Sequence, residues 1–413
     1  MRWTIAVWVV TVVLSSVGCA PPGGEYAGLV QPETLAKADL QYYWHVRCQL
    51  ERGEQINRMD LVGDRLYCLT NHNRLLALDA ARGIWLWSQD LASPRQRVFT
   101  PVHADKVLIP TRLRLPIDQD QTASVSRFDA VILNTLSEIL VLDRSTGEKV
   151  ARIPLDFPAS TSGAVGADAD TAQAEHYFLA SFRGWYYSVN LSTGLQEWGR
   201  STGGFLNSAP VYYDGILYVA GEDNVLYAVK AGRNAVPVWS SQDLDSQPMH
   251  GAVTSGIHVD SRGCFVPCQD NRLYAYNPIN GRPLWEPFVC QQPLQDNVQV
   301  GDNSIFLLAR RDNFYAIDVA KGAKRWSLPL GRLVLATMQD RTDRVYLLDA
   351  DNNLRVLDEM TGKASAVLPM TGLDRFLPNT TVPAIYAATR KGRIVCIRLA
   401  SAGYLTPEMF QQP

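Results

Sequence analysis

Apolar residues in this chain come in short runs that alternate with turn-forming residues at a nearly regular spacing. A typical unit is 217–230, in which two apolar strands flank a polar turn at 222–224. The pattern recurs eight times, and its units end at Asp79, Asp143, Asn190, Lys230, Asn277, Asp318, Asp358 and Arg398. In all but one case the units are about 40–47 residues apart, which is the period of a four-stranded propeller blade.

Two positions of the repeat carry the residues that tight hairpins need. The sixth residue before the end of each unit is Asn, Asp, Ser or Gly, and the fourth residue after the end is glycine in six units. A tryptophan follows four residues after this glycine in four units, and Trp239 takes the same role after a small insertion. We expect these tryptophans to pack where adjacent blades meet: Trp87, Trp198, Trp239, Trp285 and Trp326.

The eighth unit lacks its last strand, because no glycine and tryptophan follow Arg398. A strand with alternating apolar and polar residues stands instead near the start of the chain, at 41–50. We expect it to complete the last blade and so remove the open edge of the ring. The sequence thus predicts an all-β fold at 40–400: an eight-bladed β-propeller of four-stranded antiparallel blades, closed by an N-terminal strand.

The residues on either side of the repeats predict export and tethering. Residues 1–18 have a positive start, a short apolar run and small residues after it, as in a signal peptide. The end of this run resembles a bacterial lipobox with Cys19 as the lipidated residue, although an ordinary signal peptide with an incidental cysteine is the alternative. By the same resemblance, Ala20 favours the outer membrane. We expect 19–39 to be a flexible tether and 401–413 a C-terminal tail.

The second unit is about 22 residues longer than the others, and the extra residues lie near 111–132. We expect them in the turn between the second and third strands of the blade, on the face that carries the blade-to-blade connections. Insertions on one face often mark a binding face. A decoration without function is the alternative.

The composition and the histidine positions point to no catalytic or metal site. The net charge of −2 disfavours a nucleic-acid partner, and none of the six histidines lies in a metal motif. We therefore expect no cofactor, no metal and no catalytic residues. Cys48 and Cys396 belong to neighbouring strands of the closing blade; they form either a cross-strand disulfide or two buried thiols, because the register is unknown.

Residues 75–87, 186–198, 273–285 and 314–326 resemble the repeat of pyrroloquinoline-quinone-type (PQQ-like) propellers. A lipidated signal before a single propeller is most similar to BamB-type outer-membrane assembly lipoproteins. That resemblance implies a scaffold beside the barrel insertase, on the periplasmic side of the outer membrane. Quinone-dependent dehydrogenases also share the repeat, but they carry two adjacent cysteines, and no two cysteines are adjacent here.

We therefore expect a non-catalytic, monomeric propeller with protein partners in the cell envelope and a membrane attachment through Cys19. The alternative function is binding of a carbohydrate or another envelope polymer on the face with the insertion. A quinone-dependent oxidoreductase is the third hypothesis.

Overall fold

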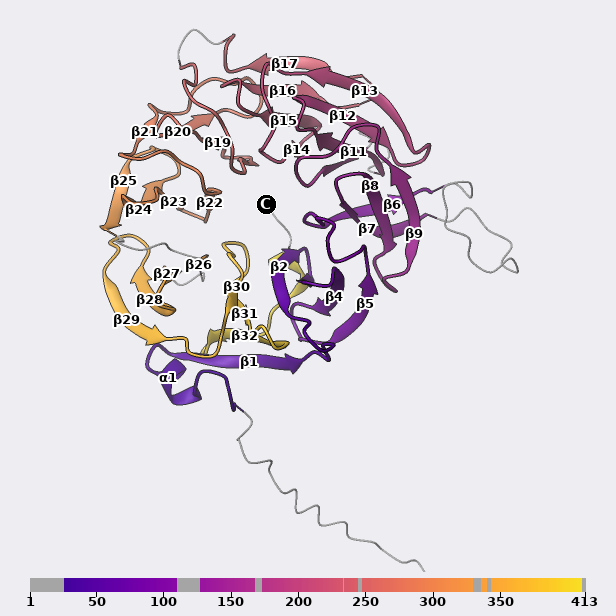
Figure 1. Cartoon of the computed structure of the whole chain (residues 1–413). Helices are drawn as coiled ribbons and strands as arrows, with labels where there is room; N and C mark the ends of the chain where they lie inside the picture. Colours follow the sequence, from indigo (N-terminus) through magenta and orange to yellow (C-terminus); the bar gives the residue numbers. More distant parts are fainter. Residues whose placement is uncertain are drawn as a thin grey trace, which may run out of the picture.

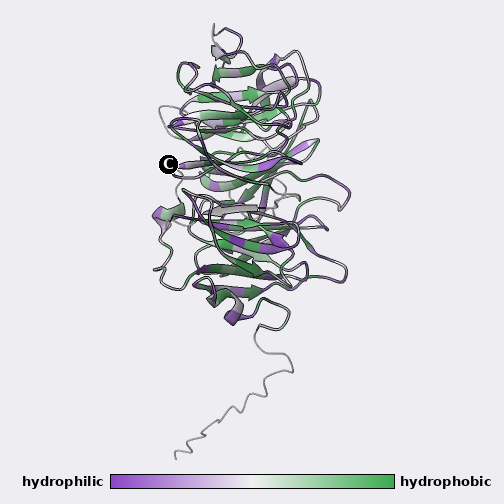
Figure 2. Cartoon of the chain, turned by 90° about the vertical axis from the view of Figure 1, so that its left-hand side faces the viewer, coloured by the Kyte–Doolittle hydropathy of each residue, from purple (hydrophilic) through white to green (hydrophobic). Residues whose placement is uncertain are grey.

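The computed structural model describes residues 26–109, 127–167, 173–232, 234–243, 247–329, 336–339 and 343–410. These residues form eight four-stranded antiparallel sheets around a central axis, as the sequence predicted (Figure 1). Apolar residues fill the strands and polar residues lie mainly in the turns (Figure 2). We number the blades one to eight along the chain and count strands outward from the axis.

The first four blades follow one another without exchange of strands. Blade 1 contains β2 (Ile56–Val62), β3 (Arg65–Thr70), β4 (Arg74–Asp79) and β5 (Trp85–Asp90). Blade 2 contains β6 (Val102–Val107), β7 (Phe128–Asn134), β8 (Glu138–Asp143) and β9 (Lys149–Pro154). Blade 3 contains β10 (Ala164–Ala167), β11 (Ala174–Ala180), β12 (Trp185–Asn190) and β13 (Leu195–Ser201). Blade 4 contains β14 (Val211–Tyr213), β15 (Ile216–Ala220), β16 (Leu226–Lys230) and β17 (Val236–Ser240).

The next three blades repeat this order. Blade 5 contains β18 (His258–Asp260), β19 (Gly263–Pro267), β20 (Arg272–Tyr276) and β21 (Phe288–Val289). Blade 6 contains β22 (Gln299–Val300), β23 (Ser304–Leu308), β24 (Asn313–Asp318) and β25 (Lys324–Pro329). Blade 7 contains β26 (Ala336–Gln339), β27 (Arg344–Leu348), β28 (Asn353–Asp358) and β29 (Ala364–Pro369).

Blade 8 joins the two ends of the chain. It contains β30 (Arg375–Phe376), β31 (Ile385–Ala388), β32 (Arg393–Leu399) and, as its outer strand, β1 (Leu40–Arg47). β1 pairs antiparallel with β32 from Leu40↔Leu399 to Arg47↔Arg393. The predicted closing strand is therefore confirmed, and the sheet bonds of this blade hold the ring shut.

The hairpin turns have the backbone conformations that their residues favour. In the turn between the second and third strands, a residue with positive φ is Asn in four blades and Gly in two: Asn73, Gly184, Asn224, Asn271, Asn352 and Gly392. The glycine between the third and fourth strands also has positive φ in all six units that carry it, such as 68° at Gly83. Both residue types adopt this left-handed region at low cost.

Antiparallel strands place the turns on two faces of the ring. The connection face carries the turns between second and third strands and the blade-to-blade connections. The glycine-turn face carries the turns between first and second and between third and fourth strands. The two faces alternate along each blade because each strand crosses the full thickness of the ring.

The insertion in blade 2 is attached to the other face from the one expected, as the strands on either side of it show. The first strand extends to Val107, which pairs with Phe128 of the second strand, so the extra residues separate β6 from β7. They therefore leave from the glycine-turn face. In the sequence, the apolar residues Val107 and Ile109 resemble the second strand of the blade. The insertion that follows them was therefore expected between the second and third strands, whereas it lies between the first and second. Most of 111–132 lies outside the described residues, and 128–132 belong to β7.

The described parts of the expected tether and tail pack against the propeller. Leu29, Val30 and Leu35 are buried in one apolar cluster with residues of blades 7 and 8, and helix α1 (Pro32–Ala36) contacts β1 and β29 (Figure 1). At the other end, Leu405 and Phe410, at the last turn η2 (Pro407–Phe410), are buried against blades 8 and 1. The expected signal peptide and Cys19 lie outside the described residues. Among the described helices, none has the length and apolar character needed to cross a membrane.

Candidate functional site: blade seams, axial cavity and connection face

Each of the five tryptophans singled out in the sequence lies at a seam between blades. Its indole N–H donates to a backbone carbonyl of the next blade, one or two residues past the end of the third strand there. The bonds are Trp87 to Arg144 (3.0 Å), Trp198 to Gly232 (2.8 Å), Trp239 to Pro278 (3.0 Å), Trp285 to Val319 (3.2 Å) and Trp326 to Glu359 (2.6 Å).

At the seams of Trp87, Trp285 and Trp326 the indole needs a glycine on the neighbouring blade. A Cβ added at Gly147 would lie 2.4 Å from the Trp87 ring, and one at Gly322 would lie 2.4 Å from the Trp285 ring. Real Cβ atoms do not approach that closely, so the indole lies flat against glycine backbone. The glycine of the repeat thus serves two purposes, since it also supplies the positive φ of its turn.

Sequence reasoning missed a sixth seam tryptophan. Trp44 on β1 donates to Ala80 O (3.2 Å), and a Cβ on Gly83 would lie 2.5 Å from its ring. The signal was present in the sequence, because the closing strand takes the outer position of blade 8, where five other blades carry a seam tryptophan.

Two seams have alanine in place of tryptophan, at Ala151 and Ala366. Ala151 is buried in a cluster shared by blades 2 and 3, to which Leu155, Phe157 and Val165 add apolar surface. Ala366 packs against the cluster that contains Leu35 and the rest of the N-terminal segment.

Of the two alternatives for Cys48 and Cys396, the structure has the two buried thiols and not the cross-strand disulfide. The register explains why, because Trp44 is the partner of Cys396 and Cys48 follows the end of β1. Burial raises the pKa of Cys48 to about 12 and also raises that of Cys396. Both sulfurs therefore stay protonated and poorly reactive.

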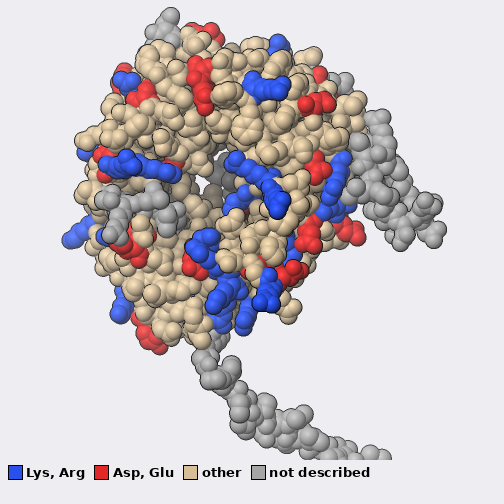
Figure 3. Space-filling view, in the orientation of Figure 1, with Lys and Arg blue, Asp and Glu red and all other residues tan. Residues whose placement is uncertain are grey.

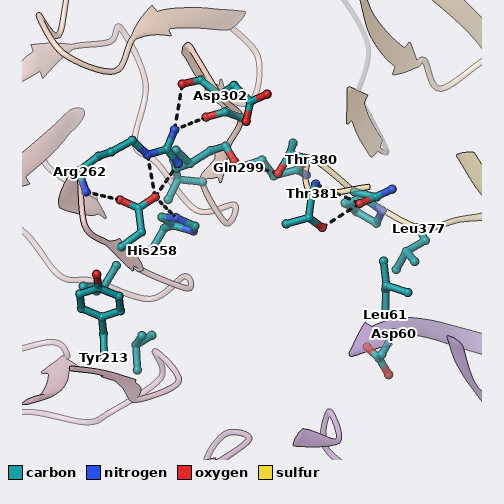
Figure 4. A pocket seen from close by; sticks show the side chains of 18 of the residues that line it. Asp60, Leu61, Tyr213, His258, Arg262, Gln299, Asp302, Leu377, Thr380 and Thr381 are labelled. Atoms are coloured by element: carbon teal, nitrogen blue, oxygen red, sulfur yellow. Dashed lines mark hydrogen bonds and ion pairs between the residues drawn. The ribbon is translucent and has the colours of Figure 1, made fainter. Parts of the chain in front are cut away.

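An axial cavity of about 610 Å³ lies among the inner strands. Its walls come from β2, β14, β18, β22 and the segment after β30, with Thr100 from the approach to β6. The labelled side chains in Figure 4 converge from blades far apart in the sequence. Figure 3, viewed along the same direction as Figure 1, shows an open centre with Lys and Arg side chains beside it.

One wall of the cavity is a network around Asp260 (Figure 4). Asp260 accepts from His258 Nε2 (3.1 Å), from Arg262 Nε (3.0 Å) and from the backbone N–H of Arg262 (2.8 Å). Burial alone would raise the pKa of Asp260, but these hydrogen bonds outweigh it and hold the pKa below its usual range. Arg262 also donates to Gly301 O (2.6 Å) and Asp302 O (3.0 Å), so its guanidinium links blade 5 to blade 6 by hydrogen bonds.

Asp60, on the opposite wall, is paired with an arginine from behind the lining, Arg58. Arg58 Nε lies 2.8 Å from Asp60 Oδ2, and the same guanidinium donates to Val98 O and Phe99 O between blades 1 and 2. Burial raises the pKa of Asp60, although the Arg58 charge works against that shift. Sequence reasoning found neither pair.

The connection face carries exposed apolar side chains over blades 2 to 4. We define the apolar loop patch as Leu136, Phe182, Trp185 and Phe205, with exposed fractions from 36% to 57%. The loops that hold them touch one another: Ala159 N bonds Leu136 O (2.9 Å), and Ala159 pairs with Ser181. The Trp185 ring stacks on Phe157 with centroids 5.9 Å apart. Large apolar side chains held in neighbouring loops are typical of protein-binding surfaces.

The described residues contain no group of three or more His, Cys, Asp or Glu placed to hold a metal ion. His103 is half-buried with its Nε2 2.9 Å from Tyr67 Oη, and desolvation together with Arg144 lowers its pKa to about 3. It is therefore a neutral packing residue at the seam of blades 1 and 2.

Solved structures with the same architecture include BamB from Moraxella catarrhalis. It is 13% identical with a TM-score of 0.60, over 89% of this chain and 99% of that one. The computationally designed protein Ika8 is also 13% identical, with a TM-score of 0.58, over 83% and 96%. At these identities the likeness shows the fold alone.

Curated relatives carry the same name as the first of these structures. The outer membrane protein assembly factor BamB of Yersinia pestis is 21% identical over 262 residues, 60% of this chain and 65% of its own length. That of Moranella endobia (strain PCIT) is 23% identical over 215 residues, 48% of this chain and 53% of its own length. The chain thus matches less than two thirds of either relative.

A family model covers more of the chain than either relative does. The model described as outer membrane protein assembly factor BamB, built on the PQQ-like repeat, matches residues 135–304 and 289–401. These matches span blades 3 to 8 and most of the hairpins in which the repeat was first seen. The chain belongs to this family of PQQ-like propellers.

Proposed function

We propose that this protein is a non-catalytic scaffold for outer-membrane protein assembly in the cell envelope. The observation that carries the proposal is the family match at 135–304 and 289–401. A closed ring of rigid blades with loops gathered on one face suits a protein that holds partners in place, since sites on rigid elements are well defined. The expected signal peptide and Cys19 support export and attachment to the outer membrane.

The apolar loop patch is the surface that we assign to the partner, a subunit of the barrel-insertase machinery. Its aromatic side chains are anchored by stiff turns, so little side-chain entropy is lost on binding. Aromatic residues are also enriched among residues that dominate binding energy. The charged residues at the rim of the patch include Arg183 and Glu222.

The test is crosslinking in cells of the native organism, followed by mass spectrometry of what co-purifies. We expect the insertase subunit to be recovered with the unchanged protein and lost with the double variant Phe182→Asp, Phe205→Asp. The matched control is Leu195→Asp, Ile279→Asp, which changes two exposed apolar residues on the glycine-turn face. Equal recovery with both double variants would reject the assigned surface, and no insertase with the unchanged protein would reject the function.

A second candidate function, ligand binding, is favoured by the axial cavity. Binding in this cavity would not involve the apolar loop patch.

A further inference from the structure

We propose that the axial cavity binds a small hydroxyl-rich ligand without negative charge, of the size of one or two sugar units. The proposal stands apart from the scaffold role, since the apolar loop patch and the cavity share no residue.

The cavity has the size and rigidity of a small-molecule site. Its volume of about 610 Å³ lies within the range of about 300–1,000 Å³ that is usual for such sites. Its walls are inner strands and their first turns, each fixed by a four-stranded blade. Arg262 further ties blade 5 to the turn 301–302 of blade 6, so the wall is set before any ligand arrives.

The charges on the wall exclude an anion. The described lining contains the carboxylates of Asp60, Asp260 and Asp302 but only one arginine, Arg262. The guanidinium of Arg262 is already bonded to Asp260 and to two backbone carbonyls. An anionic ligand would therefore meet the carboxylate of Asp302 and two carboxylates already paired with arginines, and no guanidinium of the described lining that is not already bonded.

Hydrogen-bond donors on the wall are largely used, whereas acceptors remain. Thr380 donates its hydroxyl to Val300 O (2.9 Å), and Thr381 donates to Asn379 Oδ1 (3.1 Å). The Asn379 amide donates to Val382 O and Ala384 O, both at 2.7 Å. Each of these hydroxyl oxygens can still accept a bond.

The side chain of Gln299 adds to this imbalance. It lines the cavity, and its Oε1 atom is buried without a hydrogen-bond partner among the described residues, so a small turn of the amide toward the cavity would offer this acceptor to a ligand. The His258 ring is held against Asp260, with Nε2 3.1 Å from Oδ2. A wall of acceptors calls for a ligand that supplies many donors, and sugar hydroxyls do so without charge. Tyr213 adds an aromatic surface for the apolar face of a sugar ring.

The test uses the purified protein and three disaccharides: cellobiose, N,N′-diacetylchitobiose and a uronate analogue of cellobiose. Saturation-transfer NMR and calorimetry report binding. We expect a neutral disaccharide to bind with a millimolar or tighter dissociation constant and the uronate to bind at least about tenfold more weakly, the factor expected for one unfavourable charge contact.

The variant Gln299→Leu removes the unpartnered acceptor at nearly constant volume. We expect the melting temperature of the free protein not to fall, because a buried polar atom without a partner is lost, and the affinity to fall about tenfold. The matched control is Gln196→Leu on β13, where another buried Oε1 lacks a partner far from the cavity. It should leave the affinity unchanged.

Three outcomes would overturn the proposal. They are no binding of either neutral disaccharide to the folded protein, equal binding of the uronate, or equal weakening by the two glutamine variants. Binding of only one neutral disaccharide supports it and identifies the preferred sugar.

Discussion

The seam between blades 6 and 7 contains Trp326, whereas the next seam around the ring contains Ala366 at the same place in the repeat. The first seam is filled by one side chain that packs on Gly362 and bonds Glu359 O. The second is covered by a separate piece of chain, the segment around α1, whose Leu35 is fully buried. A seam can thus be filled by one large residue of the repeat or by residues from outside it.

The comparison teaches that the repeat alone does not seal the ring. Six seams have a tryptophan: Trp44, Trp87, Trp198, Trp239, Trp285 and Trp326. The seam of blades 2 and 3 has Ala151 and is filled by apolar residues of its own connection, such as Leu155 and Phe157. Apolar area must be buried at every seam, but its source can differ.

The largest expected effect is at a tryptophan seam. Trp326→Ala should lower the free energy of unfolding by about 3–5 kcal/mol, because a buried indole is replaced by a cavity. Chemical denaturation measures the change. The control is Trp85→Ala, an exposed tryptophan at the start of β5, for which we expect less than about 1 kcal/mol. Similar values for both would mean that the seams do not hold the blades together.

The alanine seam of blades 7 and 8 should depend on the N-terminal segment. Leu35→Ala should cost about 2–5 kcal/mol in the free energy of unfolding, since this side chain is fully buried against both blades. Leu195→Ala, at an exposed leucine, is the control and should be near neutral. A near-neutral Leu35→Ala would show that Ala366 needs no cover.

Glycine at the tryptophan seams should be needed for two separable reasons. Gly322→Ala should cost about 1–3 kcal/mol, from overpacking against Trp285 and from its φ of +65°. In a Trp285→Ala background the overpacking disappears and only the backbone cost remains. A double-mutant cycle by thermal or chemical unfolding measures the difference. Additive effects would contradict the proposed contact.

The smallest expected effect concerns the indole N–H. Trp239→Phe removes the bond to Pro278 O but keeps most of the ring packing. The carbonyl remains bonded to Tyr218 Oη (2.8 Å), so we expect a loss of only about 0.5–1.5 kcal/mol in the free energy of unfolding. A loss as large as that of Trp326→Ala would place the importance of the seam in the hydrogen bond rather than in packing.

Features that repeat were predictable from the sequence. The turn residue recurs in eight units and the glycine in six, at fixed positions of a unit of about 40–47 residues. The closing strand was predictable because it fills the one position that the eighth unit leaves empty. The strand expected at 41–50 is β1 at Leu40–Arg47. The insertion was misplaced because Val107 and Ile109 form an apolar pattern where the neighbouring blades have their second strand.

Features that occur once could not be predicted in this way. The cavity brings Asp60 together with Asp260 and Thr380, which are separated by most of the chain and meet only through ring closure. The packing of Leu29 and Leu35 was hidden because a segment rich in Pro and Gly precedes them and suggested a tether. Alternate residues of an inner strand face the axis. In an inner strand of only three residues, the sequence shows too little alternation to tell which residues these are.

The pairing of β1 with β32 also sets an order of events during synthesis. Residues 40–47 leave the ribosome early, but their partners at 393–399 follow only when almost the whole chain has been made. Until then the edge of β32 does not exist and β1 has no sheet to join. The blades between them can fold one after another, yet the last step is a contact of very high sequence separation, which is slow to form. The ring can therefore close only after residues 393–399 have been made, so a chain that stops before them leaves β1 without its partner strand.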